Sequence, residues 1–165
     1  MKQSLAISKL IELKKQYNRQ QYPNIPEHGL PEVKYSDNSA NNLTKCIINY
    51  LELLGHSAER INVQGRRIDN TKIVTDVLGH RKMIGSIEWQ KSTGKVGRAD
   101  IHAKIKHDKY KFAIPIEIEV KFGKDRQSEK QKAYQLEMEN IGTPYVIVKT
   151  FQEFYDWFDK WYNNL

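Results

Sequence analysis

The segment PIEIEVKFG alternates charged and apolar side chains, and its charged residues are of the types that bind metal ions and phosphates. Successive side chains of a β-strand point to opposite faces, so Glu117, Glu119 and Lys121 share one face of the predicted strand. Upstream, GRADIHAKI alternates in the same way and carries Asp100 among its polar residues. The intervening KHDKYK predicts a tight turn that pairs the two strands, with Asp100 opposite Glu117 and diagonal to Glu119. Two carboxylates and a lysine are therefore expected to converge on one sheet face.

This cluster fits the hydrolysis of phosphodiester bonds. The Asp100 and Glu119 carboxylates, with the backbone carbonyl of Val120, are hard oxygen ligands of the kind that Mg²⁺ or Mn²⁺ takes. Lys121 would position or activate the attacking water, or stabilise the charge that develops on phosphorus. Glu117 is a candidate further ligand, directly or through water. The simpler alternative is that these charges line the solvated face of an ordinary strand.

Gln131 has two interpretations. The segment from Ser128 to Gln131 reads S-x-x-Q, a capping box that satisfies amide groups in the first turn of a helix. Alternatively, Gln131 and Gln135, four residues apart on one helical face, point back over the strand toward a phosphate or the attacking water. The two roles are compatible, and the sequence leaves both open.

The composition agrees with a nucleic-acid ligand without requiring one. The 165 residues include 27 Lys and Arg against 20 Asp and Glu, a formal net charge of +7, which favours polyanionic partners. Hydrophobic residues make up 39% of the chain, which fits one folded domain, and no apolar run approaches the roughly 20 residues that span a bilayer. The single cysteine, Cys46, excludes an internal disulfide and indicates a reducing compartment, so a cytoplasmic location is expected.

Hydrophobic periodicity predicts the elements that position the cluster. Helical spacing is expected in four segments, at residues 3–20, 39–54, 128–141 and 150–165. Segments of period two between residues 59 and 122, and the later PYVIVKT, predict strands. This order indicates an α/β fold, borderline α+β, with a central mixed β-sheet flanked by helices. A proline-containing connection follows the first helix, so residues 1–38 are predicted to be an appendage and residues 39–165 the main domain. The aromatic stripe of the last helix is expected in the core or at a subunit interface.

In this order and context, Asp100, the Glu-Val-Lys triplet at 119–121 and the following S-x-x-Q resemble the PD-(D/E)XK nuclease superfamily. The sequence is most similar to the VRR-NUC group of virus-type replication-repair nucleases. GRADIHAKI matches its Gly-x-x-Asp strand, IEIEVK its Glu-x-Lys strand, and RINVQGR its Arg-x-Asn stretch, within a resemblance that covers residues 40–158. It implies a restriction-endonuclease-like core with an extra N-terminal helix, Mg²⁺ or Mn²⁺ as cofactor, Asp100 and Glu119 as metal ligands, and Lys121 as the catalytic lysine.

The same resemblance implies an endodeoxyribonuclease that acts on DNA. Stand-alone members of the group look like homodimers that cut branched DNA, such as junctions or flaps, in replication, repair or recombination. A phage or mobile element, and hence a host cytoplasm, would fit such a protein. Nucleic-acid contacts are expected from nearby basic and amide side chains, namely Arg60, Asn62, Arg66, Arg98, Lys124, Arg126 and Gln135.

One departure from the group keeps other functions open. Where the group carries a glutamate near the start of its first core helix, this chain has Asn41 and Asn42. Either Glu117 compensates from the strand, or metal affinity is lowered, or catalysis is lost. A catalytically inactive nucleic-acid-binding domain on the same fold is therefore the second hypothesis, and a protein-interaction scaffold that uses the aromatic C-terminal helix is the third. The insertion before Gly97 either grips a nucleic-acid backbone with its basic residues or is a solvated hairpin.

Overall fold

A computed structural model describes residues 4–62 and 65–165 of the chain. The predicted helix start at residue 3, and Val63 and Gln64 of the Arg-x-Asn stretch, lie outside the described residues. The chain divides into two compact units, of which unit 1 comprises Met1–Ile61 and Gly97–Leu165 and unit 2 comprises Asn62–Val96. Within the described ranges, no helix is both long enough and apolar enough to cross a membrane.

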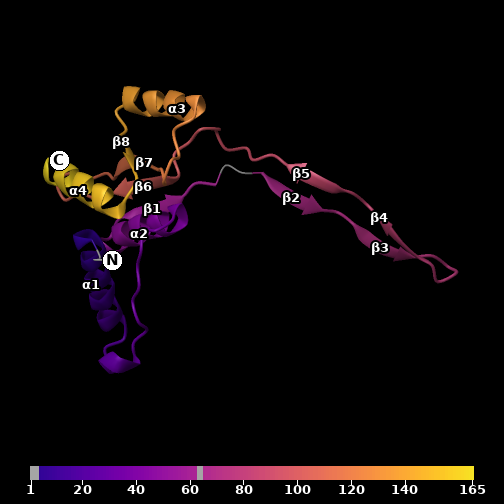
Figure 1. Cartoon of the computed structure of the whole chain (residues 1–165), viewed down its shortest axis with the longest axis horizontal. Coiled ribbons are helices and arrows are strands. Elements are labelled where there is room, and N and C mark those ends of the chain that lie inside the picture. The colour runs from indigo at the N-terminus through magenta and orange to yellow at the C-terminus, as the bar shows by residue number, and fades with distance from the viewer. Residues whose placement is uncertain (1–3, 63–64) are drawn as a thin grey trace. The chain divides into compact units, whose positions relative to one another are not determined.

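The described part of unit 1 contains four α-helices and a four-stranded mixed sheet (Figure 1). The helices are α1 (Leu5–Gln21), α2 (Ala40–Leu53), α3 (Glu129–Asn140) and α4 (Phe151–Asn163), with a short 3-10 turn η1 (Glu27–Gly29). The strands are β1 (Ser57–Arg60), β6 (Ile101–Ile105), β7 (Ile114–Val120) and β8 (Tyr145–Val148). They lie in the order β1-β6-β7-β8, and only the β7–β8 pair is parallel. The predicted mixed α/β architecture and N-terminal helix are confirmed.

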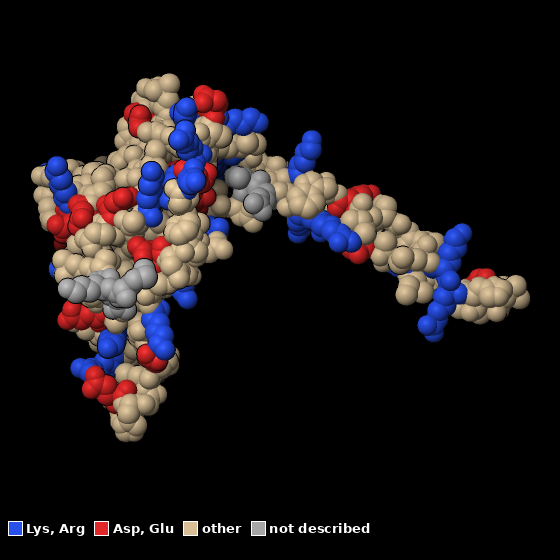
Figure 2. All heavy atoms as spheres, in the orientation of Figure 1, with Lys and Arg blue, Asp and Glu red and all other residues tan. Residues whose placement is uncertain are grey.

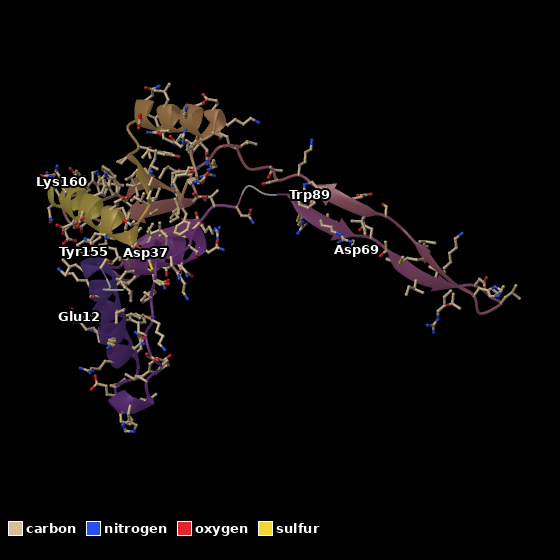
Figure 3. All side chains as sticks on the ribbon, viewed as in Figure 1. Glu12, Asp37, Asp69, Trp89, Tyr155 and Lys160 are labelled. Atoms are coloured by element: carbon tan, nitrogen blue, oxygen red, sulfur yellow. The ribbon has the colours of Figure 1, made fainter. Side chains whose placement is uncertain are left out.

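Each α-helix begins after a hydroxyl side chain that accepts a hydrogen bond from the amide of the third helical residue, which satisfies one of the unpaired donors of the first turn. These N-caps are Ser4, Ser39, Ser128 and Thr150. Helix α4 has a further acceptor, because the Asp37 carboxylate (labelled in Figure 3) accepts a bond of 2.9 Å from the Phe151 amide. The connection before α2 is thereby tied to the start of α4.

One face of the sheet forms the hydrophobic core with α1, α2 and α4. The sheet contributes buried aliphatic residues at alternate positions of β6 and β7, namely Ile101, Ala103, Ile105, Ile116, Ile118 and Val120. The helices contribute Ala6, Ile7, Leu10, Leu43, Cys46, Ile47, Tyr50, Leu51, Phe151, Phe154 and Phe158. Helix α1 therefore shares one core with the sheet, and the Lys9 ammonium lies 5.6 Å from the ring centre of Tyr155 on α4. The aromatic side chains of α4 lie partly in this core, which was one of the two predicted locations, the other being a subunit interface.

The opposite face of β7 is buried as well, although its residues are charged. Glu117 is 3% exposed, Glu119 is 0% exposed and Lys121 is 6% exposed. Hydrogen bonds from Gln131 and Tyr134 of α3 reach these glutamates, so α3 covers this face. The alternative of a solvated strand face is therefore wrong, and the buried charges require partners.

Unit 2 is built from two antiparallel strand pairs that follow one another along a ribbon (Figure 1). In the first pair β2 (Arg66–Asp69) lies beside β5 (Ile87–Gln90), and in the second β3 (Lys72–Thr75) lies beside β4 (Arg81–Ile84). The predicted single segment ERINVQGRRID is divided between β1 and β2. Alternation in the sequence identifies a strand but not its partner, and here β2 to β5 pair with one another instead of joining the main sheet.

Gly97, which precedes β6 in the sequence, makes a close backbone contact with α3. Its φ of +89° is readily adopted only by glycine, and a Cβ at this position would lie 2.5 Å from the carbonyl oxygen of Lys130. Lys130 belongs to the first turn of α3, one residue before Gln131. The contact therefore holds this turn close to the chain that leads into Asp100.

We predict that Gly97→Ala destabilises unit 1 more than Gly142→Ala does. Gly142 has a similar φ of +81° but no atom within 4 Å of a built Cβ, so its replacement carries only the backbone cost of about 1–2 kcal/mol. Gly97→Ala adds a collision with backbone, worth about 1–3 kcal/mol. Urea unfolding of both variants measures the difference, and equal losses would show that the close contact is absent.

Candidate active site

Strands β6 and β7 bring Asp100 and Glu119 to the same place on the sheet. Their register pairs Ile101 with Ile118 and His102 with Glu117, so the next residue along, Asp100, lies at the level of Glu119. The Asp100 carboxylate accepts a bond of 2.9 Å from the amide of Val120. The predicted position of Asp100, opposite Glu117, is wrong by two residues.

The error comes from the connection between the two strands. Strand β6 ends at Ile105 and β7 begins at Ile114, which leaves a longer loop than the predicted tight turn. This loop is held by tertiary contacts, because Lys109 Nζ and Tyr110 Oη donate bonds of 2.5 Å and 3.0 Å to the carbonyl of Leu165. Turn propensity alone does not anticipate such a contact with the end of the chain.

Glu119 is the most enclosed member of the cluster, and three side chains donate to it. Its Oε1 atom lies 2.8 Å from Lys121 Nζ and also accepts from the Gln131 amide nitrogen. Its Oε2 atom accepts a bond of 3.3 Å from the Tyr145 hydroxyl on β8. The lysine is held from a second side by the Asp125 carboxylate, 3.3 Å away. A buried carboxylate is thus fully hydrogen-bonded, as its burial requires.

Burial and like charge determine the protonation of these groups. Burial raises the pKa of Glu119 above its usual range, and the Asp100 charge acts in the same direction, against the opposing effect of Lys121. Burial also acts to lower the pKa of Lys121, but its hydrogen bond to Glu119 and the Glu119 charge outweigh it, so this pKa is raised. Burial and the Glu119 charge likewise raise the pKa of Tyr145. Lys121 and Tyr145 therefore keep their protons near neutral pH and act as donors.

Gln131 forms the predicted capping box and also contacts the charged cluster, while its predicted contact with a phosphate or the attacking water stays a prediction. Its Oε1 atom accepts a bond of 2.9 Å from the Ser128 amide, while the Ser128 hydroxyl accepts from the Gln131 amide, which completes the capping box. The same Oε1 accepts from Lys121 Nζ at 3.1 Å, and the side-chain nitrogen donates to Glu119. The side-chain oxygen of Gln131 thus binds both the helix cap and Lys121, and its side-chain nitrogen binds Glu119.

Glu117 forms a second cluster on the same buried face. Its Oε1 atom accepts a bond of 3.0 Å from Tyr134 on α3 and lies 3.1 Å from His102 Nδ1 and 3.9 Å from Arg98 Nη2. Its Oε2 atom is buried and has no hydrogen-bond partner within the described residues. Arg98, expected at nucleic acid, therefore lies beside Glu117 with its side chain about a third exposed.

The remaining residues expected to contact nucleic acid lie outside this network. Lys124 and Arg126 are exposed on the loop between β7 and α3. Gln135, expected to point toward a phosphate or the attacking water, forms hydrogen bonds with Gln127 and Glu139. Arg60 is the last residue of β1 in unit 1, whereas Asn62 and Arg66 belong to unit 2.

Asn41 and Asn42, the residues at which this chain departs from the VRR-NUC pattern, both form hydrogen bonds with other side chains. Asn41 accepts a bond of 2.9 Å from Arg60 Nη1, and Asn42 donates 2.7 Å to Asn38. These amides therefore stabilise the start of α2 and its contact with β1. Asn41 and Asn42, which stand where the VRR-NUC group has a glutamate, thus have a structural role at the start of α2.

Two tyrosines and an aspartate complete the site without having been predicted. Tyr134 lies three residues after Gln131 on the same helical face, so the helical period could have selected it in preference to Gln135. Asp125 lies four residues after Lys121 in a loop. Tyr145 pairs in register with Glu117 across parallel strands, and no local sequence pattern indicates that pairing.

The donor set suits a hard divalent cation. Asp100 and Glu119 bring two carboxylates to one level of the sheet, and Val120 adds a carbonyl. Glu117 carries a buried oxygen that has no hydrogen-bond partner among the described residues. Across the part of the chain that the structure describes, no group of three or more His, Cys, Asp or Glu side chains is arranged to hold a metal ion. The predicted set of two carboxylates and one carbonyl does not depend on such a group.

Comparisons of the chain with known protein families, with curated proteins and with solved structures found no match. The resemblance to PD-(D/E)XK nucleases consequently depends on the residues named above and on their arrangement between β6, β7 and α3.

We predict that Gln131→Glu separates the two roles of this side chain. A glutamate keeps the oxygen that completes the capping box, but it removes the donor to Glu119 and adds a like charge. We expect a loss of about 1–3 kcal/mol in unfolding free energy at pH 8, the cost of removing one hydrogen bond to a buried charged group. Ser128→Ala, which removes only the cap, should cost about 1 kcal/mol. An unchanged stability of Gln131→Glu in chemical denaturation would contradict the assigned contact.

A second prediction follows from the raised pKa of Glu119. The folded state holds this proton more tightly than the unfolded state, where the pKa is near 4.5, so the resulting stabilisation is complete below pH 4.5 and is lost as the pH rises through the folded value. In metal-free buffer, wild type should therefore lose stability relative to Glu119→Gln between pH 4.5 and 8. Unfolding free energies against pH measure this, with the exposed Glu129→Gln as background. A wild-type advantage that grows with pH would show that the Lys121 charge dominates instead.

Proposed function

We propose that this chain is a Mg²⁺- or Mn²⁺-dependent endonuclease that hydrolyses phosphodiester bonds in DNA. The proposal includes a restriction-endonuclease-like core of the PD-(D/E)XK type, close to the VRR-NUC group. One observation carries it: Asp100 and Glu119 lie at one level of adjacent strands, with Lys121 Nζ 2.8 Å from Glu119 on a buried polar face. A strand that only needed stability would bury apolar side chains there, since buried charges are costly unless paired.

The residues of the chain have distinct roles in the proposed reaction. Asp100 and Glu119, with the Val120 carbonyl, would hold the metal ion, which when bound polarises the phosphate and lowers the pKa of a water. Lys121 retains its proton, which favours the stabilisation of negative charge on the phosphate over the removal of a proton from water. Gln131 and Tyr145 orient the Glu119 carboxylate.

Glu117 is proposed to support the site from the neighbouring cluster. Its hydrogen bond from Tyr134 and its proximity to His102 and Arg98 fix one oxygen, while the other is buried and has no hydrogen-bond partner in the described ranges. A buried oxygen of this kind requires a cation or a water as partner. This supports the expectation from the sequence that Glu117 is a further metal ligand, directly or through water.

A catalytically inactive nucleic-acid-binding domain is the second candidate. The specific observation in its favour is that Asn41 is engaged with Arg60, so α2 brings an amide where the resembling group has a carboxylate. The two candidates share the fold and the basic residues, and they differ in metal-dependent cleavage. A homodimer acting on branched DNA is part of the first proposal and is carried by the resemblance alone.

The test is cleavage of junction, flap, single-stranded and linear DNA with Mg²⁺ or Mn²⁺, against an EDTA control. We expect product with at least one substrate, and a fall of about 10²–10³-fold in rate for Asp100→Asn, Glu119→Gln and Lys121→Met, the typical cost of losing one electrostatic group. The matched control is Glu129→Gln, an exposed carboxylate on α3 that should leave the rate unchanged.

Two results would count against the proposal. Absence of cleavage of every substrate with either metal, by protein that still binds DNA, would favour the inactive binding domain. Cleavage that persists in Glu119→Gln would mean that the active site lies elsewhere or that the activity belongs to a contaminant.

A further inference from the structure

The ribbon of unit 2 exposes several large apolar side chains. The side chains of Ile73 and Met83, paired across β3 and β4, are each 70% exposed. At the turn between the strands, Val77 is 102% exposed and Leu78 is 78% exposed. An isolated two-stranded hairpin is only marginally stable in water, and exposed apolar clusters mark interaction sites. The ribbon therefore needs a partner that covers it.

The two strand pairs share one register. Arg66 pairs with Gln90 and Lys72 pairs with Ile84, which is the same register without an inserted residue. At the junction, the Asn70 amide donates a bond of 3.1 Å to the carbonyl of Ser86. At about 3.3 Å per residue, the strand from Arg66 to the turn spans roughly 30 Å. This length is close to one turn of duplex DNA, about 34–36 Å.

Charge identifies the class of partner. The basic residues of unit 2 are Arg66, Arg67, Lys72, Arg81, Lys82, Lys91 and Lys95, against the acidic residues Asp69, Asp76 and Glu88. Figure 2 shows Lys and Arg side chains along the ribbon and mostly uncharged atoms at its turn. Strands β3 and β4 contain basic residues and no acidic one. A partner that covers these strands must therefore carry negative charge.

The acidic residues of the ribbon are largely used by its own backbone. Asp76 accepts from the amides of Leu78 and His80 at 2.9 Å and 2.8 Å and so forms the turn. Asp69, labelled in Figure 3, accepts from the amide and hydroxyl of Thr71. Among the described residues, Lys72, Arg81 and Lys82 form no ion pair. The basic groups of β3 and β4 are thus available to a ligand, whereas Asp69 and Asp76 already accept hydrogen bonds within the ribbon.

We infer that the β3–β4 hairpin lies along a groove of duplex DNA, with Lys72, Arg81 and Lys82 at phosphates and the Val77–Leu78 turn against the bases. Two-stranded ribbons fit DNA grooves, and architectural proteins press apolar side chains such as leucine between base steps. This inference rests on the proposed function only for the choice of DNA as ligand, and it involves no catalytic step. A second copy of the ribbon is a poorer occupant, because it would set rows of like charge against each other.

The first test is the salt dependence of binding to a labelled duplex, measured by fluorescence anisotropy with the full chain in EDTA so that nothing is cut. The variant Lys72→Ala/Arg81→Ala/Lys82→Ala should reduce the slope of log K against log salt by about 2.7, or about 0.9 for each phosphate contact. The control Lys15→Ala/Arg19→Ala/Lys34→Ala removes the same charge from exposed positions of unit 1. A change in the ribbon variant no larger than in this control would overturn the inference.

The second test concerns the turn. In a duplex that contains 2-aminopurine, wild type should raise the fluorescence by unstacking the base, and Val77→Ser/Leu78→Ser should abolish that rise while leaving the salt slope unchanged. If both variants bind and unstack DNA as wild type does, and the turn variant instead changes a dimer into a monomer in sedimentation, the ribbon contacts a second copy and the inference is wrong.

The outcomes separate this inference from the proposed nuclease. Ribbon variants that bind like the control, in a protein that still cuts DNA with Mg²⁺, would remove the inference alone. A reduced salt slope in a protein that never cuts DNA would support the ribbon contact and remove the nuclease proposal alone.

Discussion

The burial of the Glu119 carboxylate is the constraint on which the rest of the site depends. A carboxylate that is 0% exposed is tolerated only when donors surround it, and here they come from the residue directly after β7, the neighbouring strand and the covering helix. Lys121 supplies charge, while Gln131 and Tyr145 supply neutral donors. Because Lys121 directly follows β7, Gln131 lies on α3 and Tyr145 lies on β8, the carboxylate ties together the elements that enclose it.

Several features of the surrounding structure position the donors to Glu119. The capping box fixes the start of α3, and Gly97 lets the first turn of that helix lie against the chain that leads into Asp100. Parallel pairing of β7 with β8 positions Tyr145 beside the strand that carries both glutamates. The aliphatic residues on the other side of β7 anchor it in the core. A precise polar site thus sits on rigid elements, as pre-organised electrostatics requires.

The sequence predicted the pieces of this arrangement better than their connections. The alternation of Glu117, Glu119 and Lys121 was sufficient to place them on one face, because side-chain direction in a strand follows from position alone. The sequence predicts Asp100 opposite Glu117, but it lies opposite Glu119. The two-residue error arises because tertiary contacts with Leu165 decide the length of the loop between the strands. Tyr145 was missed because a parallel neighbour leaves no local pattern. Unit 2 was recognised as strands, but period two cannot show that its strands pair only with each other.

The central claim is that this buried polar face is a divalent-metal site. The most direct measurement is the anomalous signal of Mn²⁺ in crystals soaked with manganese, with an identical soak of Glu119→Gln crystals for comparison. We expect a peak between the Asp100 and Glu119 carboxylates in the wild-type protein that is lost in the variant. A fully soaked crystal with no peak there, or with an equal peak in Glu119→Gln, would contradict it.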